Sequence, residues 1–331
     1  MASVQQFRKR IKSIQNTRQI TKAMEMVASV KMQKAVKSIL EARSYVQNSW
    51  NMFAKLARLI LPGDHPLLNP TPVGKTAIIF ITSDRGLCGS YNADLLKKLT
   101  ATVKELKSSG HPRPVSGNRV NSGGDPVTVD SRVKPENDNS VDIIAVGKKG
   151  ADYVKNYNLG NLVAVFDGFE SNIHFEDIIP ISKMTNGEYL QGKYDKVVVI
   201  YSHFISSLAQ MPVVKQILPV DREHIDLPEL WEDTQDPRVR EDDKGDVEYK
   251  FEPNADEILD KLLRRFLRLS IYGAVLEANA SEYSAQMVAM RNATDNAKDL
   301  IDELQLTYNS VRQASITREI AEISGAAEAM K

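Results

Sequence analysis

The chain has 331 residues, which is enough for one large domain or two ordinary domains with a real hydrophobic core. Basic and acidic side chains balance at 43 each, so net charge indicates no nucleic-acid partner. A single cysteine, Cys88, excludes an intrachain disulfide and a cage of thiolate metal ligands. The five histidines follow no metal-binding spacing, and no apolar run approaches the roughly 20 residues of a membrane-spanning helix.

Residues 1–61 are predicted to form one long helix, because neither proline nor glycine occurs before Pro62. Apolar residues recur at the spacing of one helix face. They are Val4, Phe7, Ile11, Ile14, Met24, Val27 and Ala35. A helix of ~57 residues would span on the order of 85 Å, which favours a coiled coil over an ordinary globular helix. Residues 1–40 carry nine Lys and Arg against one acid, Glu25, so this helix has either a solvated basic face or an acidic partner.

Residues 75–219 are predicted to form an inserted Rossmann-like α/β domain. Four continuous apolar runs, typical of strands buried on both faces, lie within residues 75–84, 141–150, 161–169 and 195–204. The segments around 91–106 and 175–190 supply the intervening helices.

Two segments are additions to this domain. Residues 110–140 are dense in Gly, Pro, Ser and Asn, which predicts an exposed and partly disordered loop. Residues 220–252 form an acidic insert or linker, with thirteen acids against five bases from residue 221 on. Within it, "LPELWED" is compatible with a turn of helix and "VEYKFE" with a strand.

Residues 253–331 are predicted to form a second long helix that begins after Pro253. Its apolar and small residues step by three and four as far as Val311. They are Ile258, Leu262, Phe266, Leu269, Gly273, Leu276, Ala280, Tyr283, Met287, Met290, Thr294, Ala297, Ile301, Leu304, Tyr308 and Val311. A repeat near 3.5 predicts a left-handed supercoil with the first helix, and a helix in a larger bundle is the alternative.

One stretch has a chemical character, the strand-to-helix turn "ITSDRGLCGSYN" at residues 81–92. Phosphates bind at such turns, yet the glycine spacing matches neither established phosphate motif. Cys88 could serve as a nucleophile, but no histidine is near it in sequence. A tight turn with Ser90 or Asn92 near the helix cap is the simpler interpretation. The sequence therefore predicts no catalytic residue, cofactor or metal ligand, and an α/β enzyme for a phosphate ligand with coiled-coil arms remains the alternative function.

Four segments in order resemble signatures of the gamma subunit of F-type ATP synthase, bacterial type. They are "NTRQITKAMEMVASVKM" (16–32), "ITSDRGLCGSYN" (81–92), "MRNATDNAKDLI" (290–301) and "YNSVRQASITREIAEISGA" (308–326). "FEPNADEIL" (251–259) also resembles the family's entry to its last helix. The resemblance implies a non-catalytic rotor shaft, with a long antiparallel two-helix coiled coil built from both chain ends around the α/β domain.

The resemblance also implies partners and a location. The shaft of this family turns inside a head of three alpha and three beta subunits, and its α/β domain meets the epsilon subunit and the c-ring. Ion flow, of H⁺ or Na⁺, turns the ring and drives ATP synthesis at the beta sites. The chain is therefore expected to be peripheral on the cytoplasmic face of the bacterial plasma (inner) membrane, touching the membrane only through the c-ring. Residues 202–219, after the last predicted strand, are expected near the ring and epsilon.

Six residues are expected to contact alpha or beta subunits, by the same resemblance. They are Lys22, Met24, Lys31, Arg312, Gln313 and Thr317. Met24 could instead belong to the seam between the helices, and Thr317 could cap or face solvent.

Two further expectations concern the insert and the tail. No cysteine occurs in residues 221–250, so the dithiol regulation of chloroplast relatives is excluded, and deletion of this segment tests whether it inhibits the head. The loop 110–140 is expected to be dispensable for rotation. If both helices start at the α/β domain, the second loses its partner near residue 311. The small residues beyond it suit a bearing that turns in an apolar sleeve. They include Ala314, Ser315, Ala321, Ser324, Ala326 and Ala327.

Overall fold

The structure is a computed structural model that describes residues 4–59, 67, 75–108, 141–169, 173–220 and 255–330. The predicted loop 110–140 and the acidic segment 221–250 lie outside the described residues. The chain divides into two compact units, which are described one after the other. Unit 1 comprises Met1–Lys31, Leu87–Gly89 and Tyr283–Lys331, and unit 2 comprises Met32–Gly86 and Ser90–Glu282.

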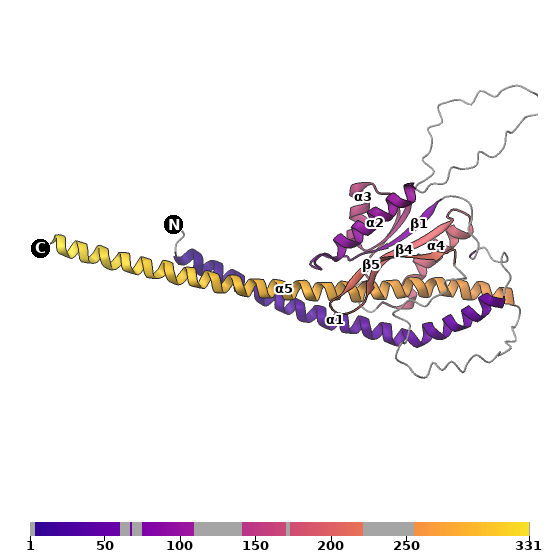
Figure 1. The fold of residues 1–331 in the computed structure, drawn as a ribbon, viewed down its shortest axis with the longest axis horizontal. Helices are drawn as coiled ribbons and strands as arrows, with labels where there is room; N and C mark the ends of the chain where they lie inside the picture. The colour runs from indigo at the N-terminus through magenta and orange to yellow at the C-terminus, as the bar shows by residue number, and fades with distance from the viewer. Residues whose placement is uncertain are drawn as a thin grey trace, which may run out of the picture. The chain divides into compact units, whose positions relative to one another are not determined.

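Two long helices dominate the chain, as the sequence predicts. Helix α1 spans Val4–Leu59 and helix α5 spans Ala255–Ala329 (Figure 1). Helix α1 is uninterrupted because it contains no proline or glycine. Each helix contributes one part to unit 1 and another part to unit 2.

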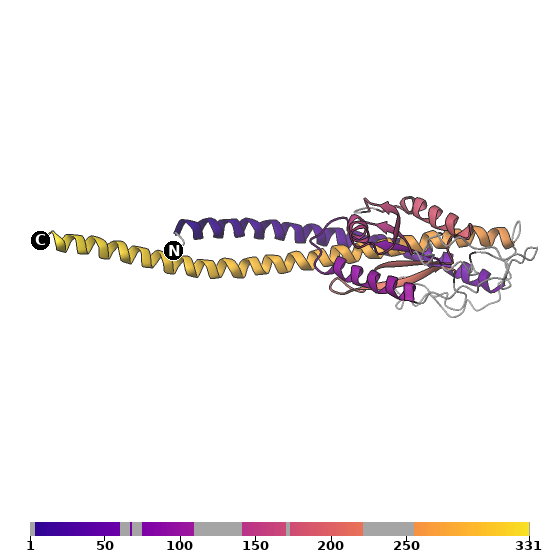
Figure 2. The same cartoon turned by 90° about the horizontal axis from the view of Figure 1, so that it is seen from above.

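In unit 1 the two helices pack antiparallel. The hydroxyl oxygens of Thr21 and Thr294 are 2.8 Å apart, and the Lys31 ammonium lies 5.2 Å from the centre of the Tyr283 ring. Residue numbers therefore rise along α1 while they fall along α5, and both views of the structure show the helices running together here (Figures 1 and 2). Continued at equal rise per residue, this register puts Val4 opposite residue 311.

The burial pattern of α5 in unit 1 follows the predicted spacing of three and four. Six predicted seam residues are buried and three are half-buried. They are Tyr283, Met290, Thr294, Ala297, Ile301 and Leu304, then Met287, Tyr308 and Val311. A seam with this period is what a coiled coil requires. The left-handed supercoil itself stays a prediction.

One predicted seam residue of α1 is wrong. The Val27 side chain is 57% exposed, whereas the neighbouring Ala28 is only 1% exposed. Successive helical residues point about 100° apart, so only one of the two can face the seam. The small alanine takes that position, and the larger valine remains on the outer surface.

Unit 2 contains a five-stranded sheet with the order β3-β2-β1-β4-β5. Its strands are β1 (Thr76–Ile81), β2 (Asp142–Val146), β3 (Asn161–Phe166), β4 (Lys196–Phe204) and β5 (Gln210–Leu218). The first four are parallel and match the predicted runs, and β5 pairs antiparallel with β4. Strand β5 lies in the segment 202–219, for which no strand was predicted.

Helices cover both faces of the sheet. They are α2 (Tyr91–Ser108), α3 (Lys148–Tyr157), the short 3-10 helix η2 (Phe175–Ile178) and α4 (Ile179–Leu190). Helices α2 and α3 lie over one face, where Gly150 of α3 comes so close to the Phe80 ring that an added Cβ would lie 2.8 Å from it (Figure 1). Helix α3 was not predicted, because "KKGADYVKNY" is short and mostly polar.

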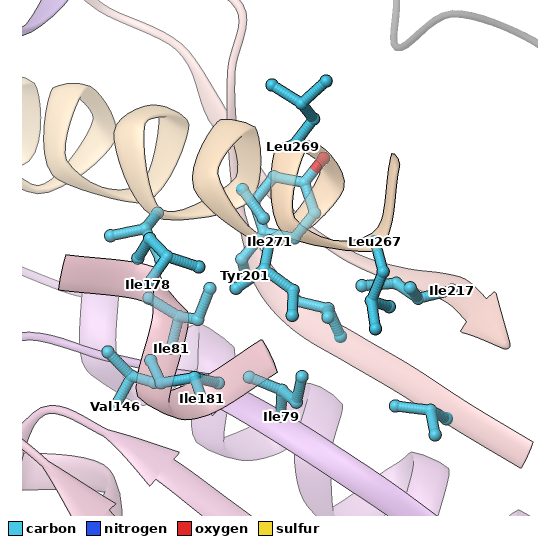
Figure 3. Close-up of a cluster of buried hydrophobic side chains, with 14 of the residues drawn as sticks. Ile79, Ile81, Val146, Ile178, Ile181, Tyr201, Ile217, Leu267, Leu269 and Ile271 are labelled. Atoms are coloured by element: carbon cyan, nitrogen blue, oxygen red, sulfur yellow. The ribbon is translucent and has the colours of Figure 1, made fainter. Parts of the chain in front are cut away.

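The other face of the sheet packs against α4 and the part of α5 in unit 2. Isoleucines of β1 and α4 and the apolar face of α5 meet there (Figure 3). Leu267 and Ile271 of α5 are almost completely buried against this layer. Fully burying side chains of this size contributes about 1.5–3 kcal/mol each, so the α5 segment is an integral part of the domain core.

Candidate functional site

The turn after β1 meets the ends of two neighbouring strands through one carboxylate. The Asp84 side chain accepts a hydrogen bond from the backbone N–H of Lys148 at 2.9 Å and another from that of Gly168 at 3.0 Å. Lys148 is the first residue of α3, and a helix N-terminus attracts anions. The carboxylate therefore occupies the place where a phosphate would be held in a nucleotide-binding domain.

No room for a ligand remains beside this carboxylate. Gly147 has a φ of +101°, and a Cβ built there would lie 2.2 Å from the Thr82 carbonyl oxygen. Side chains of α5, including Val275 and Asn279, close the gap and leave a cavity of about 10 Å³. Such a space admits one water molecule. This geometry argues against a phosphate enzyme at the turn.

Cys88 does not provide a nucleophilic site either. Its side chain is only 3% exposed, so a substrate has no access to the sulfur. Its neighbours Leu87 and Gly89 both have positive φ angles, of 68° and 58°. An added Cβ at Gly89 would lie 3.7 Å from the Ala289 methyl group, so this turn packs closely on α5. Asn92, in the first turn of α2, joins this helix to the start of the turn, because its side chain accepts from the Ser83 N–H at 3.3 Å and donates to the Ser83 hydroxyl at 2.7 Å.

The three predicted contact residues of α1 lie in unit 1. The Lys22 side chain is 55% exposed and forms an ion pair of 3.0 Å with Glu25 in the same helix. Met24 is half-buried, and Lys31 is half-buried with its ammonium over the Tyr283 ring. Exposed ion pairs of this kind stabilise little, so the Lys22 charge is available to a partner.

An open groove of about 800 Å³ lies beside Lys22 and is lined by several positively charged side chains. Lys12 and Arg18 also line it, and Met26 contributes an apolar side chain. Several apolar side chains of α1 in unit 1 point away from the seam. They are Ile20, Met26, Val27 and Val30. Sequence reasoning missed this second apolar stripe, although the spacing of 20, 23, 27 and 30 was visible in "ITKAMEMVASV".

The other three predicted contact residues lie on the far part of α5. Arg312, Gln313 and Thr317 are all exposed, and the Thr317 hydroxyl donates to the Gln313 carbonyl at 3.0 Å. Within the described residues, the side chains of Arg312 and Gln313 have no hydrogen bond or ion pair. From residue 312 to 327 every side chain except Ser315 is exposed, as the comparison of helix lengths predicts.

The structure does not bring the two groups of predicted residues together. Lys22 lies opposite about residue 293 of α5, so Arg312 is roughly 28 Å further along the helix at 1.5 Å per residue. The six residues therefore form two separate stations in unit 1, one basic and amphipathic on α1 and one on the unpaired part of α5.

A buried charged cluster lies at the opposite, amino edge of the sheet. The Asp142 carboxylate accepts hydrogen bonds from Tyr194 at 2.8 Å and Asn161 at 3.0 Å, and Lys75 forms an ion pair of 3.1 Å. Burial acts to raise the pKa of Asp142, but these partners outweigh burial and hold the pKa below its ordinary value. Burial, with hydrogen bonds to Glu188 and Asp142, raises the pKa of Tyr194 far above its ordinary value. These interactions stabilise the domain and leave no open site.

A family model described as ATP synthase matches residues 3–330. A relative from Roseiflexus sp. (strain RS-1), named ATP synthase gamma chain, is 36% identical over 100% of this chain and 99% of its own length. The chain belongs to the ATP synthase gamma chain family. A gamma chain from Acidithiobacillus ferrooxidans (strain ATCC 53993 / BNL-5-31) is 35% identical over the full length of both proteins.

Solved structures of mitochondrial ATP synthases contain chains that share the fold. A chain of the OSCP/F1/c-ring structure of Euglena gracilis mitochondrial ATP synthase matches with a TM-score of 0.61 and 18% identity. The match covers 99% of this chain and 94% of that one. A chain from the central stalk and c-ring of the Tetrahymena thermophila enzyme matches with a TM-score of 0.51 and 22% identity, over 83% and 99%. Among the described helices of this gamma-family chain, none is long and apolar enough to cross a membrane.

Proposed function

We propose that this chain is the central rotor shaft of an F-type ATP synthase and contains no catalytic residues of its own. The observation that carries the proposal is the full-length match to gamma chains, combined with a long helix pair whose second helix continues alone. A shaft changes the affinities of several sites only if it touches them differently as it turns. An asymmetric helix pair with two different stations meets this requirement.

The α1 station is proposed to meet the beta subunits of the head. Lys22 and Lys31 provide positive charge, and Met24 lies between them on the same helix. Alongside, the exposed apolar stripe of α1 offers surface for a partner with both acidic and apolar side chains. An acidic loop on the beta subunit has this chemistry, so the basic face of α1 is proposed as the surface that this loop contacts while the shaft turns.

The α5 station is proposed to act at the top of the shaft. Arg312, Gln313 and Thr317 are exposed where α5 has just lost its partner. A beta loop can therefore reach them from several directions. Beyond them the helix is proposed to turn in an apolar sleeve of the head, where the small side chains act as a bearing.

The α/β domain is proposed to face epsilon and the c-ring, with one shaft for three alpha and three beta subunits. One similar chain comes from the rotor of the Euglena gracilis mitochondrial ATP synthase and another from its OSCP/F1/c-ring assembly, which supports this arrangement. Location on the cytoplasmic face of the bacterial inner membrane, with ion flow through the ring, follows from this placement.

Co-purification tests the proposal. The chain is expressed with its alpha, beta and epsilon partners, and the subunit ratio is measured by native mass spectrometry. One copy for three alpha and three beta subunits is expected. Equal copy numbers, or no association, would overturn the rotor function. A thermal-shift measurement with nucleotides on the chain alone tests the enzyme alternative, since a real site would stabilise the fold.

A further inference from the structure

A short segment of α5 in unit 2 is buried on every side. Five consecutive residues, Glu277 to Ser281, are all at least nine-tenths buried. A helix at the edge of a domain buries one face and exposes the other. The buried stretch extends back to Gly273, so the domain encloses about two and a half turns of α5, whereas Lys261 and Arg265 earlier in the helix stay exposed.

Polar contacts surround the turn from Glu277 to Ser281. Glu277 Oε2 lies 2.7 Å from His203 Nδ1, and the Ser281 hydroxyl donates to the Ser202 carbonyl at 3.0 Å. We call the complete set of four contacts the polar collar. It joins Glu277, Ala278, Asn279 and Ser281 of α5 to His203, Tyr91, Phe169 and Ser202.

The collar grips α5 from opposite sides. Glu277 and Ser281, four residues apart, point in nearly the same direction, toward β4. Asn279 points about 200° away from Glu277, and its amide donates to the Phe169 carbonyl after β3 at 2.8 Å. The Tyr91 hydroxyl of α2 donates to the Ala278 carbonyl at 3.1 Å. Three separate elements of the domain therefore hold one turn of helix.

Directional contacts resist rotation in a way that apolar packing does not. Leu267 and Ile271 contribute stability without specifying a direction, since apolar attraction depends on buried area. Turning α5 about its axis would instead break buried hydrogen bonds and leave their donors and acceptors unsatisfied. The contact between Glu277 and His203 adds an acidic and a basic group that are largely removed from solvent.

Helix α1 is attached to the same domain differently. From Met32 to Ala42, the side chains described on α1 in unit 2 make hydrogen bonds and ion pairs only within the helix. Ile39 belongs to the hydrophobic core of the domain, and Ala35, Val36 and Ala42 pack against that core while partly buried. An open apolar groove of about 350 Å³ separates part of α1 from Phe204.

From this contrast we infer that the α/β domain turns α5 through the polar collar, and that the described part of α1 in this unit, residues 32–42, packs on the domain through apolar contacts and carries little of the torque. The inference rests on the proposed rotor function. Asn279, Ser281 and their partners are positioning residues, because they act on the head only through the shaft.

The test uses single-molecule rotation of the complete ATP synthase driven by ATP hydrolysis. A bead is attached to the α/β domain through Lys104→Cys on α2, an exposed position, while the buried Cys88 stays unlabelled. The double variant Asn279→Ala/Ser281→Ala is compared with Ser38→Ala, which removes a hydroxyl whose hydrogen bond stays within α1. Rotation is measured with a small bead and with a large bead.

With the small bead, the collar variant is expected to rotate at the rate of the unchanged enzyme. With the large bead, its torque is expected to fall roughly twofold or more, while Ser38→Ala keeps full torque. Ser281→Ala alone is measured in parallel. If the double variant does not assemble, this single variant still allows the loaded torque to be compared with that of the control. Equal torque of the collar and control variants with the large bead overturns the inference. A collar variant that is less stable but behaves like the control with both the small and the large bead also overturns it. If the unchanged chain does not rotate at all, the rotor function itself fails instead.

Discussion

Thr21 and Thr294 meet hydroxyl to hydroxyl at 2.8 Å across the antiparallel helix pair of unit 1. The Thr21 hydroxyl donates to the Arg18 carbonyl at 3.0 Å, and the Thr294 hydroxyl shares its single proton between Thr21 Oγ1 and the Met290 carbonyl oxygen, each 2.8 Å away. Neighbouring seam residues such as Ala297 and Ile301 are apolar. A single polar pair in an apolar seam specifies register, because any shift leaves both groups facing apolar neighbours.

Register specification predicts coupling between the two threonines. Thr294→Val alone is expected to lower the free energy of unfolding by about 1 kcal/mol, because it removes the partner of the Thr21 hydroxyl. The double variant Thr21→Val/Thr294→Val is expected to lose less than the sum of the single variants. Urea unfolding of the full chain in a double-mutant cycle measures this coupling. Strictly additive losses would show that the hydroxyl pair carries no specific interaction.

The Asp84 carboxylate at the N-terminus of α3 predicts that phosphate will restore stability when this side chain is removed. Asp84→Ala is expected to lower the free energy of unfolding by about 2 kcal/mol, since it removes the partner of two backbone N–H groups. Millimolar phosphate is expected to raise the melting temperature of this variant but not that of the unchanged chain, because the helix N-terminus is then vacant. Asp152→Ala, on the exposed surface of α3, is the matched control. Equal phosphate responses in all three proteins would contradict the assignment.

The Asp142 cluster predicts a loss of stability in acid. The folded pKa of Asp142 is depressed below the unfolded value of 3.8, so its contribution is fully present at neutral pH. That contribution is lost as the pH falls from about 4 through the folded pKa. Asp142→Asn is expected to lower stability at pH 7 by about 1–3 kcal/mol and to make the acid decline shallower. Unfolding curves from pH 7 to 2 check this, with the exposed Asp94→Asn as control.

The basic station on α1 predicts salt-dependent assembly. Lys22→Gln/Lys31→Gln is expected to slow association with the alpha–beta head several-fold at low salt, because charge complementarity accelerates encounter. At about 0.5 M salt the difference is expected to disappear through screening. Lys37→Gln, an exposed lysine elsewhere on α1, is expected to associate at the unchanged rate. A salt-independent defect would point to lost packing, for example at the Tyr283 ring, in place of steering.

The unpaired end of α5 predicts a difference between the free and the assembled chain. Deleting residues 325–331 is expected to leave urea unfolding of the isolated chain unchanged, since the side chains described there are exposed. Thermal dissociation of the assembled complex is expected to occur at a lower temperature, while torque changes little. Scanning calorimetry and loaded rotation measure the two effects. A lower stability of the isolated chain would mean that the tail packs on its own protein.

Helical periodicity predicted both long helices and the seam of α5, but it did not settle the seam of α1. Val27 is the more apolar residue, yet Ala28 is buried. The interface selects the smaller side chain where two helix backbones approach closely. A single-chain pattern does not contain that distance, because it is set by the partner helix.

Two features of the α/β domain could also not be predicted from the local sequence pattern. Strand β5 contains Pro212, Lys215 and Gln216, which weaken a strand signal. An edge strand tolerates them, because one side of β5 faces no other strand among the described residues. In the sequence, Asp84 belongs to a turn that resembles a phosphate-binding turn. Its role became visible only because Lys148 and Gly168, more than sixty residues away, bring their N–H groups to it.

The exposed end of α5 has a consequence for the chain outside its assembly. Ile316, Ile320 and Ile323 are all exposed and, at spacings of four and three, lie on one side of the helix. A newly made copy without partners therefore exposes a hydrophobic surface to water. Surplus copies are expected to bind one another or chaperones through this surface, so the supply of this chain must match that of the head proposed to enclose it.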